Sequence, residues 1–277
     1  MTSYGFIGAG NMAGAIVRGA VGAGISPASI LLTSAHDSAR ALAAETGAEH
    51  LPDSVGLVSR LGADDVLVLA VKPQVLPGVV EEIAPVLTES AGRAPLVLSI
   101  AAGLGLERLA ALLPAGTRVV RAMPNMAAGV GASMTALAAG PGVDEAAMDS
   151  ARALMGAVGR TVELADRDFS AFVGLAGSSP AFVLAFIEAL SRAGVLGGIP
   201  KSAAVEIVTQ AVLGTALTAR AGADAAPRRS PAELIDSICS PGGTTIAGLV
   251  AMERAGFSDA VVRAFEATVA RDRELGA

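Results

Sequence analysis

The sequence has few of the side chains from which most catalytic sites are built. It contains one cysteine, Cys239, and two histidines, His36 and His50. A single cysteine excludes an intrachain disulfide and a cysteine-rich metal site. Because both histidines lie near the start of the chain, a Ser-His-Asp triad is not indicated. No cluster of histidine, cysteine and carboxylate residues points to a catalytic metal, so we expect none.

Charge and aromatic residues are also scarce. Charged residues make up 17% of the 277 residues, aromatic residues 3%, and there is no tryptophan. Hydrophobic residues reach 52%, and this apolar mass of Ala, Val, Leu and Ile suits packed helices and buried parallel strands. The formal net charge of −6 argues against nucleic acid as a partner. No uninterrupted apolar run approaches the roughly 20 residues that span a bilayer. We therefore expect no membrane partner and attribute the apolar excess to a large subunit interface.

The chain enters its first predicted strand directly. Residues 1–7 contain no basic segment followed by an apolar one, so no signal peptide is indicated and a cytoplasmic location is expected. Residues 4–7 indicate a short buried strand. The next residues, Gly8-Ala9-Gly10-Asn11-Met12-Ala13, lead into a helical pattern. This G-x-G-x-x-A pattern between strand and helix is the dinucleotide-binding fingerprint. Gly8 permits the tight turn, Gly10 lets the backbone approach a pyrophosphate, and Ala13 lets the helix lie close to the strand.

The residues after the second predicted strand bear on the choice of cofactor. A site that prefers NAD carries Asp or Glu there, which binds the ribose 2′-hydroxyl. This chain has Thr33 and Ser34, with His36 and Arg40 just beyond. Hydroxyls and cations can accept a 2′-phosphate, so we favour NADPH, with NADH possible. We expect Asp37 to cap the following helix rather than to bind ribose.

Strands alternate with helices through the first part of the chain, which predicts an α/β fold. The pattern is that of an N-terminal Rossmann-like, doubly wound parallel sheet with right-handed crossovers. A Gly/Ala-rich strand over residues 129–139 and an edge strand over 161–164 are predicted to close it. We expect this dinucleotide-binding domain to cover residues 1–163.

The remaining residues, 164–277, predict an all-α domain. Helical patterns run over 180–196, 201–220 and 231–239, and then from Thr245 to the end of the chain. The segment 180–187 is apolar on every helical face, so it must be enclosed. A domain of this size has little room to enclose a helix. The pattern therefore predicts a domain for dimerisation and substrate binding.

Two strand ends place polar residues on the edge of the sheet where ligands bind. Ala70-Val71-Lys72-Pro73 ends one predicted strand, and Met123-Pro124-Asn125 ends another. Lys72 could approach a ligand or remain a solvated lysine. Asn125 could bind a cofactor amide or the substrate, or it could form an Asx-turn after the proline.

The Ser240-Pro241-Gly242-Gly243-Thr244-Thr245 segment stops one helix and starts another. First-turn backbone N–H groups lack helical partners, and the helix dipole favours negative charge there. A substrate carboxylate could bind this turn without any Arg or Lys. The alternative is a plain helix–turn–helix with Thr244 or Thr245 as a cap.

The scarcity of acid–base side chains limits the chemistry. Glu188, Glu206 and Asp236 lie within helical patterns and are interpreted as solvated faces or caps. Hydride transfer from a nicotinamide needs mainly positioning from the protein. Reduction of a C=N bond fits especially well, since the imine nitrogen can be protonated before the hydride arrives. A hydroxy-acid dehydrogenase would need a proton donor.

These motifs resemble the pyrroline-5-carboxylate reductase family over essentially the whole chain. The resemblance rests on residues 5–12, 70–73, 99–103, 121–125, 177–178, 180–182, 231–234 and 240–249. It implies NAD(P)H-dependent reduction of 1-pyrroline-5-carboxylate to L-proline, the last step of proline synthesis. Family members are dimers with intertwined helical domains, often stacked into larger rings.

The resemblance also implies roles for individual residues. The pyrophosphate would be bound by Gly8, Ala9, Gly10, Asn11 and Met12, and the adenosine ribose or its phosphate by Ser34 with Arg40 nearby. The nicotinamide half would be lined by Ala70, Val71, Lys72, Pro73, Ala101, Ala102 and Gly103. The substrate carboxylate would be held by Ser240, Gly242, Gly243 and Thr244, with Asn125 as a further substrate contact. Thr245 would bond the ring nitrogen and act in catalysis.

Several positions depart from the family pattern. Met126-Ala127 replaces Thr-Pro, Ala176 and Ser179 replace a Ser and a Gly, and Ile235 replaces a basic residue; Ser54 stands near an expected Asn. These changes leave substrate preference open. The alternatives are a related imine or β-hydroxy acid reductase, or a non-catalytic NADP-binding regulator.

Overall fold

The computed structural model describes residues 2–90 and 92–276 and contains two compact units. The first comprises Met1–Gly177 and Thr268–Ala277, and the second comprises Ser178–Ala267. The predicted division at 163/164 therefore differs from the observed one. The reason is packing, because Phe169 and Phe172 are buried against Ala136 and Ala138 and keep this segment in the first unit.

The first unit is built on one mixed sheet with strand order β3-β2-β1-β4-β5-β6-β7-β8. The order 3-2-1-4-5-6 is that of the Rossmann fold, whose ligand crevice lies where the order reverses, outside the carboxyl ends of β1 and β4. The strands in the described residues are β1 (Tyr4–Ile7), β2 (Ile30–Thr33), β3 (Glu49–His50), β4 (Val66–Leu69), β5 (Leu96–Ser99), β6 (Val119–Met123), β7 (Ser133–Ala139) and β8 (Gly159–Glu163).

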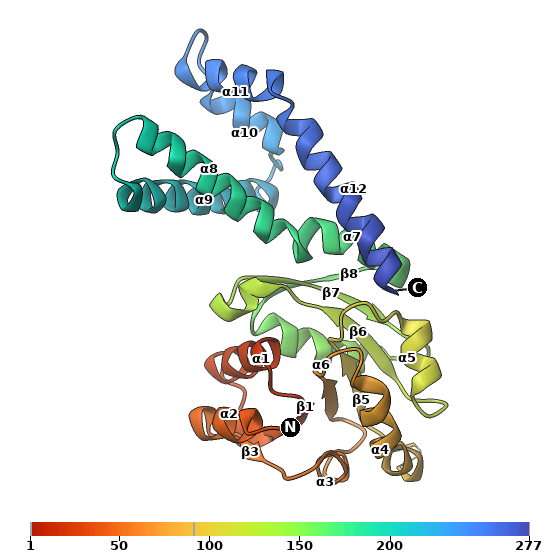
Figure 1. Cartoon of the computed structure of the whole chain (residues 1–277). Coiled ribbons are helices and arrows are strands. Elements are labelled where there is room, and N and C mark those ends of the chain that lie inside the picture. The colour runs from red at the N-terminus through yellow and green to blue at the C-terminus, as the bar shows by residue number, and fades with distance from the viewer. Residues whose placement is uncertain (1, 91, 277) are drawn as a thin grey trace. The chain divides into compact units, whose positions relative to one another are not determined.

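Helices cover both faces of this sheet, as predicted (Figure 1). One face packs on α1 (Asn11–Gly22), α2 (Ser38–Thr46) and α6 (Glu145–Gly156), the other on α3 (Ser54–Val58), α4 (Leu76–Glu89) and α5 (Leu106–Leu112). Successive residues of β4 alternate between the two cores: Val66 and Val68 face one, Leu67 and Leu69 the other. Because both faces are buried, the strand is apolar throughout rather than alternating with polar residues.

The last strands differ from the predicted all-parallel arrangement. Residues 129–139 do not form one strand, because a 3₁₀ turn over Met126–Val130 precedes β7. β7 then runs antiparallel to β6, while β8 is parallel to β7. The chain can reverse within this short connection, whereas a parallel return needs a long crossover.

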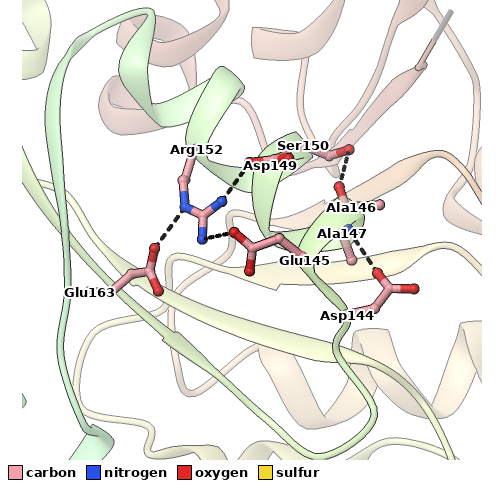
Figure 2. Close-up of polar contacts among 8 residues, drawn as sticks. All are labelled: Asp144, Glu145, Ala146, Ala147, Asp149, Ser150, Arg152 and Glu163. Atoms are coloured by element: carbon pink, nitrogen blue, oxygen red, sulfur yellow. Dashed lines mark hydrogen bonds and ion pairs between the residues drawn. The ribbon is translucent and has the colours of Figure 1, made fainter.

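An arginine on α6 ties this helix to the edge strand β8 (Figure 2). Arg152 Nε lies 2.7 Å from Glu163 Oε1 of β8, and Arg152 Nη2 lies 2.8 Å from Glu145 Oε1. Asp149 binds the same guanidinium, so three carboxylates surround it and raise the pKa of Arg152. The helix start is fixed separately, since Asp144 accepts a hydrogen bond from the Ala147 N–H at 2.9 Å. These contacts hold α6 against β8, the strand at one edge of the sheet.

The segment after β8 and the second unit are helical in the described residues. After α7 (Phe169–Phe172) and a π-helical turn (Val173–Gly177) come α8 (Ser179–Leu196), α9 (Lys201–Asp224), α10 (Pro231–Ile238), α11 (Thr244–Arg254) and α12 (Phe257–Gly276). The last helix predicted from Thr245 onward is thus two helices. Gly256 adopts φ +81°, a left-handed conformation that ends α11.

Helices α8 and α9 form a hairpin within the second unit (Figure 1). Small residues allow this close packing, since a Cβ at Gly194 would lie 3.0 Å from Ala204 Cβ. Glu188 accepts hydrogen bonds from Lys201 and Arg192, which lower the pKa of its carboxyl. Glu188 is therefore a surface ion-pair residue, in line with its predicted place on a solvated helix face.

Much of the apolar surface of this hairpin is uncovered within the chain. Leu184 is 55% exposed and Ile207 is 56% exposed. By length and composition alone, the helical stretches Asp166–Leu196 and Lys201–Asp224 could cross a membrane. Those two criteria do not distinguish a membrane span from a helix that another protein chain covers.

Candidate functional site

The glycine turn lies at the carboxyl end of β1, where the strand order reverses. Gly8 adopts φ +102°, and a Cβ there would lie only 2.5 Å from the Ala70 carbonyl oxygen. Its N–H donates to the Thr33 carbonyl at 2.9 Å. Both the left-handed backbone and the lack of space require glycine at this position. The turn thus brings together the ends of β1, β2 and β4.

Helix α1 begins with free backbone donors. Gly10 occupies the N-cap position, and among the described residues α1 has no side-chain capping hydrogen bond. A Cβ built at Gly10 would meet no atom within 4 Å, so the space in front of the helix is open. The first-turn N–H groups of Asn11 and Met12 lack helical partners and can bind a phosphate. The cradle fits the pyrophosphate of a dinucleotide.

The loop after β2 uses its hydroxyls to start α2. Ser34 Oγ donates to the His36 carbonyl at 2.6 Å and accepts from the Ala39 N–H at 3.0 Å. Asp37 occupies the N-cap position of this helix, as predicted, but its side chain makes no capping hydrogen bond among the described residues. The loop folds back, so that Ser34 rather than Asp37 accepts a side-chain hydrogen bond from the first turn of α2.

Two exposed residues in the first turn of α2 follow Ser34, in the segment predicted to bind the adenosine half of the cofactor. Arg40 is exposed on the first turn of α2. Ser38 Oγ lies 3.1 Å from Ser34 Oγ, a contact that the sequence analysis missed. The pattern of hydroxyls four residues apart at a helix start was the available signal. These residues present hydroxyls and a cation and no carboxylate other than that of Asp37.

The turns predicted to line the nicotinamide half lie at adjacent strand ends. The Ala70 N–H donates to the Ile7 carbonyl at 2.9 Å, and the Ile100 N–H donates to the Leu69 carbonyl at 3.2 Å. Ala101 is buried, Val71 is half-buried and Lys72 is exposed. A cavity of about 400 Å³ lies between the two turns; it is lined by Pro73, Gln74, Ala102, Gly103, Leu104 and Arg108, with Asp272 and Leu275 of α12.

Asn125 is held at both ends of its side-chain amide. Its Oδ1 accepts from the Ala127 N–H at 3.1 Å, which confirms the Asx-turn alternative. Its Nδ2 donates to the Ala176 carbonyl at 2.9 Å, 51 residues further along the chain. The role of Asn125 as a substrate contact stays a prediction.

A buried ion pair beside this edge was not predicted. Arg121 on β6 is 7% exposed, and its Nη1 lies 2.7 Å from Asp166 Oδ1. The other carboxylate oxygen of Asp166 accepts from the Leu106 N–H at 3.0 Å, at the start of α5. The guanidinium also lies over the Phe169 ring, 4.2 Å from its centroid. This cluster fixes the start of α5, just after the Ala101–Gly103 turn.

The predicted substrate turn lies at the start of α11 in the second unit. The Gly243 N–H donates to the Ser240 carbonyl at 3.0 Å, and Gly242 adopts φ +68°. A Cβ at Gly243 would lie 2.4 Å from Ser240 Oγ and 3.1 Å from the Ser240 carbonyl oxygen, so a larger residue would have to displace the serine hydroxyl. Gly243 is the N-cap and no side chain caps α11 among the described residues, which leaves the Thr244 and Thr245 hydroxyls exposed. The cap alternative is thus not observed, and the turn presents bare amides and hydroxyls.

The strand order, the glycine turn and the uncapped start of α1 define a Rossmann-type, dinucleotide-dependent oxidoreductase with a separate helical unit. Two family models match the chain. One, described as NADP oxidoreductase coenzyme F420-dependent, matches residues 3–103. The other, described as pyrroline-5-carboxylate reductase dimerisation, matches residues 166–275.

Individual relatives match over nearly the whole length. The pyrroline-5-carboxylate reductase of Glycine max is 37% identical over 276 residues, which is 99% of this chain and 96% of the relative. A solved structure of a pyrroline-5-carboxylate reductase from Coxiella burnetii has a TM-score of 0.90 at 32% identity, covering 100% of this chain and 99% of that one. The Plasmodium falciparum enzyme, solved with NADP bound, has a TM-score of 0.84 at 25% identity, covering 100% and 98%. The chain belongs to the pyrroline-5-carboxylate reductase family.

Proposed function

We propose that this protein reduces 1-pyrroline-5-carboxylate to L-proline, with NADPH as the preferred hydride donor. The observation that carries the proposal is the match to pyrroline-5-carboxylate reductases along essentially the whole chain. The positive-φ glycines of the two turns, Gly8 and Gly242, support the proposal because they leave the backbone open to a ligand. Bound NADPH supplies the hydride, and the protein supplies binding and orientation.

The substrate carboxylate binds the turn that starts α11. The Thr244 N–H and its neighbours have no helical acceptor, and the positive end of the helix dipole favours the anion. Ser240 and Thr244 add hydroxyl donors, while Gly242 and Gly243 let the carboxylate approach the backbone. Because this site contains no cation, it binds the acid through directed hydrogen bonds.

Thr245 acts at the other end of the substrate. Its hydroxyl bonds the ring nitrogen and orients the C=N bond so that C5 of the ring faces the hydride. A pyrroline nitrogen is basic enough to carry its own proton, so the protein need not provide a strong general acid. Positioning and exclusion of water then supply most of the acceleration.

A second copy of the chain covers the apolar faces of the helical unit. A cavity of about 530 Å³ between α9 and α10 is lined in part by the apolar side chains of Leu234, Ile235 and Ile238. The dimerisation family match spans these helices. We infer a homodimer, or a larger ring of dimers, in the cytoplasm. The net charge of −6 gives no reason to expect nucleic acid as a partner.

The direct test is NADPH oxidation in the presence of 1-pyrroline-5-carboxylate, followed by absorbance. Parallel reactions contain NADH, a six-membered cyclic imino acid, and a β-hydroxy acid with NADP. Rapid oxidation with the five-membered substrate and formation of proline are expected. Cofactor binding without turnover of any imine would instead support a non-catalytic NADP-binding protein. Faster turnover of another substrate would show that the protein is a reductase of that substrate.

Cofactor preference tests the adenosine side of the site separately. Replacing Arg40 by Ala is expected to raise the KM for NADPH by about tenfold, because a 2′-phosphate loses a charge-assisted hydrogen bond at a solvated position. The KM for NADH, which lacks that phosphate, should change less than twofold. Arg93→Ala is the control, since Arg93 is also exposed but precedes β5, at the amino ends of the parallel strands rather than at their carboxyl ends. An equal rise in the KM values for NADPH and NADH would show that Arg40 does not bind the 2′-phosphate.

A further inference from the structure

The helix that leaves the first unit contains a carbonyl without its helical partner. In an α-helix the Ala176 carbonyl would accept from the N–H of residue 180, but residue 180 is a proline and has no N–H. The N–H of Ala181, the partner in π-helical geometry, donates instead to the Ser178 carbonyl at 3.0 Å. The chain is π-helical over Val173–Gly177, immediately before this position. A half-buried carbonyl that lacks a partner costs free energy, so it needs a donor from elsewhere.

Asn125 supplies that donor. Its Nδ2 lies 2.9 Å from the Ala176 carbonyl oxygen. The same side chain is oriented by the Ala127 N–H at its Oδ1, and the Asn125 N–H donates to Ser133 Oγ at 3.2 Å. Ser133 is itself buried and lies 3.3 Å from the Thr135 hydroxyl. The amide is therefore held in one orientation by its surroundings, as a positioning group must be.

The π-helical turn lies against the end of β6 that borders the cofactor edge. Met123, the last residue of β6, packs with Ala176 against Phe169 and Phe172. A Cβ at Gly177 would lie 3.8 Å from Met123 Cε, so the turn passes close to this strand end. Asn125, two residues after β6, ties the same two segments together by a hydrogen bond.

We propose that Asn125 is a positioning residue of the reductase. Its side-chain amide donates to the Ala176 carbonyl, which has no N–H partner from Pro180, and so fixes the π-helical turn on the end of β6. The fixed turn thereby positions the residues at the end of the site where the nicotinamide binds. The hydrogen bond does not depend on the proposed function; only the expected fall in the rate of reduction rests on it. The pyrophosphate turn on β1 is not part of the contact, so cofactor affinity should change little while the rate of reduction falls.

Three substitutions at position 125 distinguish the hydrogen bond that Oδ1 accepts from the one that Nδ2 donates. Asn125→Asp and Asn125→Ser keep an oxygen that can accept from the Ala127 N–H, but the carboxylate has no hydrogen to donate and the serine hydroxyl is too short to reach Ala176. Asn125→Ala loses both bonds. All three are expected to lower kcat by about tenfold, with less than twofold change in the Kd for NADPH. If only the Asx-turn matters, Asp and Ser will behave as wild type, which overturns the proposal.

The competing role, direct contact with the substrate, gives a different kinetic pattern. A lost substrate contact would raise the KM for pyrroline-5-carboxylate, and a carboxylate at position 125 would repel the acidic substrate. Asn125→Asp would then have a much higher KM than Asn125→Ser. That result would return Asn125 to the substrate site and overturn the positioning role.

Pro180→Ala provides a rescue experiment. It restores an N–H four residues after Ala176, so the carbonyl no longer depends on Asn125. The single variant should stay within twofold of wild-type kcat, and the double variant Asn125→Ser/Pro180→Ala should recover most of the lost activity. A double variant no better than Asn125→Ser would show that the Ala176 carbonyl is not the relevant partner.

Hydrogen exchange tests the contact without any turnover. In Asn125→Ser the backbone amides of residues 169–178 should exchange at least tenfold faster than in wild type, while those of α1 remain unchanged. This measurement remains decisive if the protein reduces another substrate, and it identifies a variant that fails to fold. Unchanged exchange over residues 169–178 would overturn the proposal.

Discussion

Replacing Thr245 by Val is expected to lower kcat/KM for pyrroline-5-carboxylate by about tenfold to a thousandfold. The range corresponds to the loss of one oriented hydrogen bond to the reacting group, roughly 1–4 kcal/mol. Valine has nearly the same shape as threonine, and Thr245 is exposed at the start of α11, so the fold should tolerate the change. Steady-state kinetics with both substrates varied would measure the effect.

The control variants for Thr245 separate the hydroxyl from the side-chain shape. Thr245→Ser keeps the hydroxyl and should retain most of the activity. Thr88→Val removes an exposed hydroxyl that donates to the Ala84 carbonyl of its own helix, so its activity should match the wild type. Wild-type turnover in Thr245→Val would show that this hydroxyl does not bind the imine.

Replacing Asp166 by Ala is expected to destabilise the first unit by about 2–4 kcal/mol. The substitution leaves the buried Arg121 guanidinium without its carboxylate and removes the acceptor at the start of α5. This expected loss of stability is smaller than the loss from breaking a fully buried ion pair, because the Asp166 side chain is 31% exposed. For a unit of this size we expect the Tm to fall by about 5–15 °C. Calorimetry or circular dichroism would measure the decrease.

A neighbouring carboxylate provides the matched control for Asp166. Asp168 is exposed, and its Oδ1 lies 3.9 Å from Nε of Arg167, which is also exposed. Asp168→Ala should leave the Tm almost unchanged, because exposed ion pairs contribute little. Equal Tm values for the two variants would show that the Arg121–Asp166 contact does not hold the unit together.

Features set by neighbouring residues were predictable from the sequence. The apolar strand at Val66–Leu69 and the turn at Gly8 depend on local pattern and on the absence of a side chain, and both were found where expected. The helical second unit followed from the loss of strand pattern. The family resemblance extended this reading to the turn before α11, whose geometry cannot be deduced from its composition.

Features that depend on distant partners were not predictable. Arg121 and Asp166 are 45 residues apart, and nothing local marks either one as half of a buried pair. Asn125 and Ala176 are 51 residues apart, and only the structure brings them together. The direction of β7 was missed because a Gly/Ala-rich segment carries little information on where the chain turns. The break at Gly256, by contrast, had a signal in the glycine itself.

The first unit is discontinuous in the sequence, and this has a practical consequence. Thr268–Ala277 belongs to it although 90 residues of the second unit, Ser178–Ala267, intervene. A Cβ at Gly276 would lie 3.4 Å from the Gly103 carbonyl oxygen, so the final helical turn packs beside a predicted nicotinamide turn. A simple truncation after Gly177 would therefore yield an incomplete fragment. To prepare a nucleotide-binding module alone, one would have to splice the last helical turns back onto it through a linker.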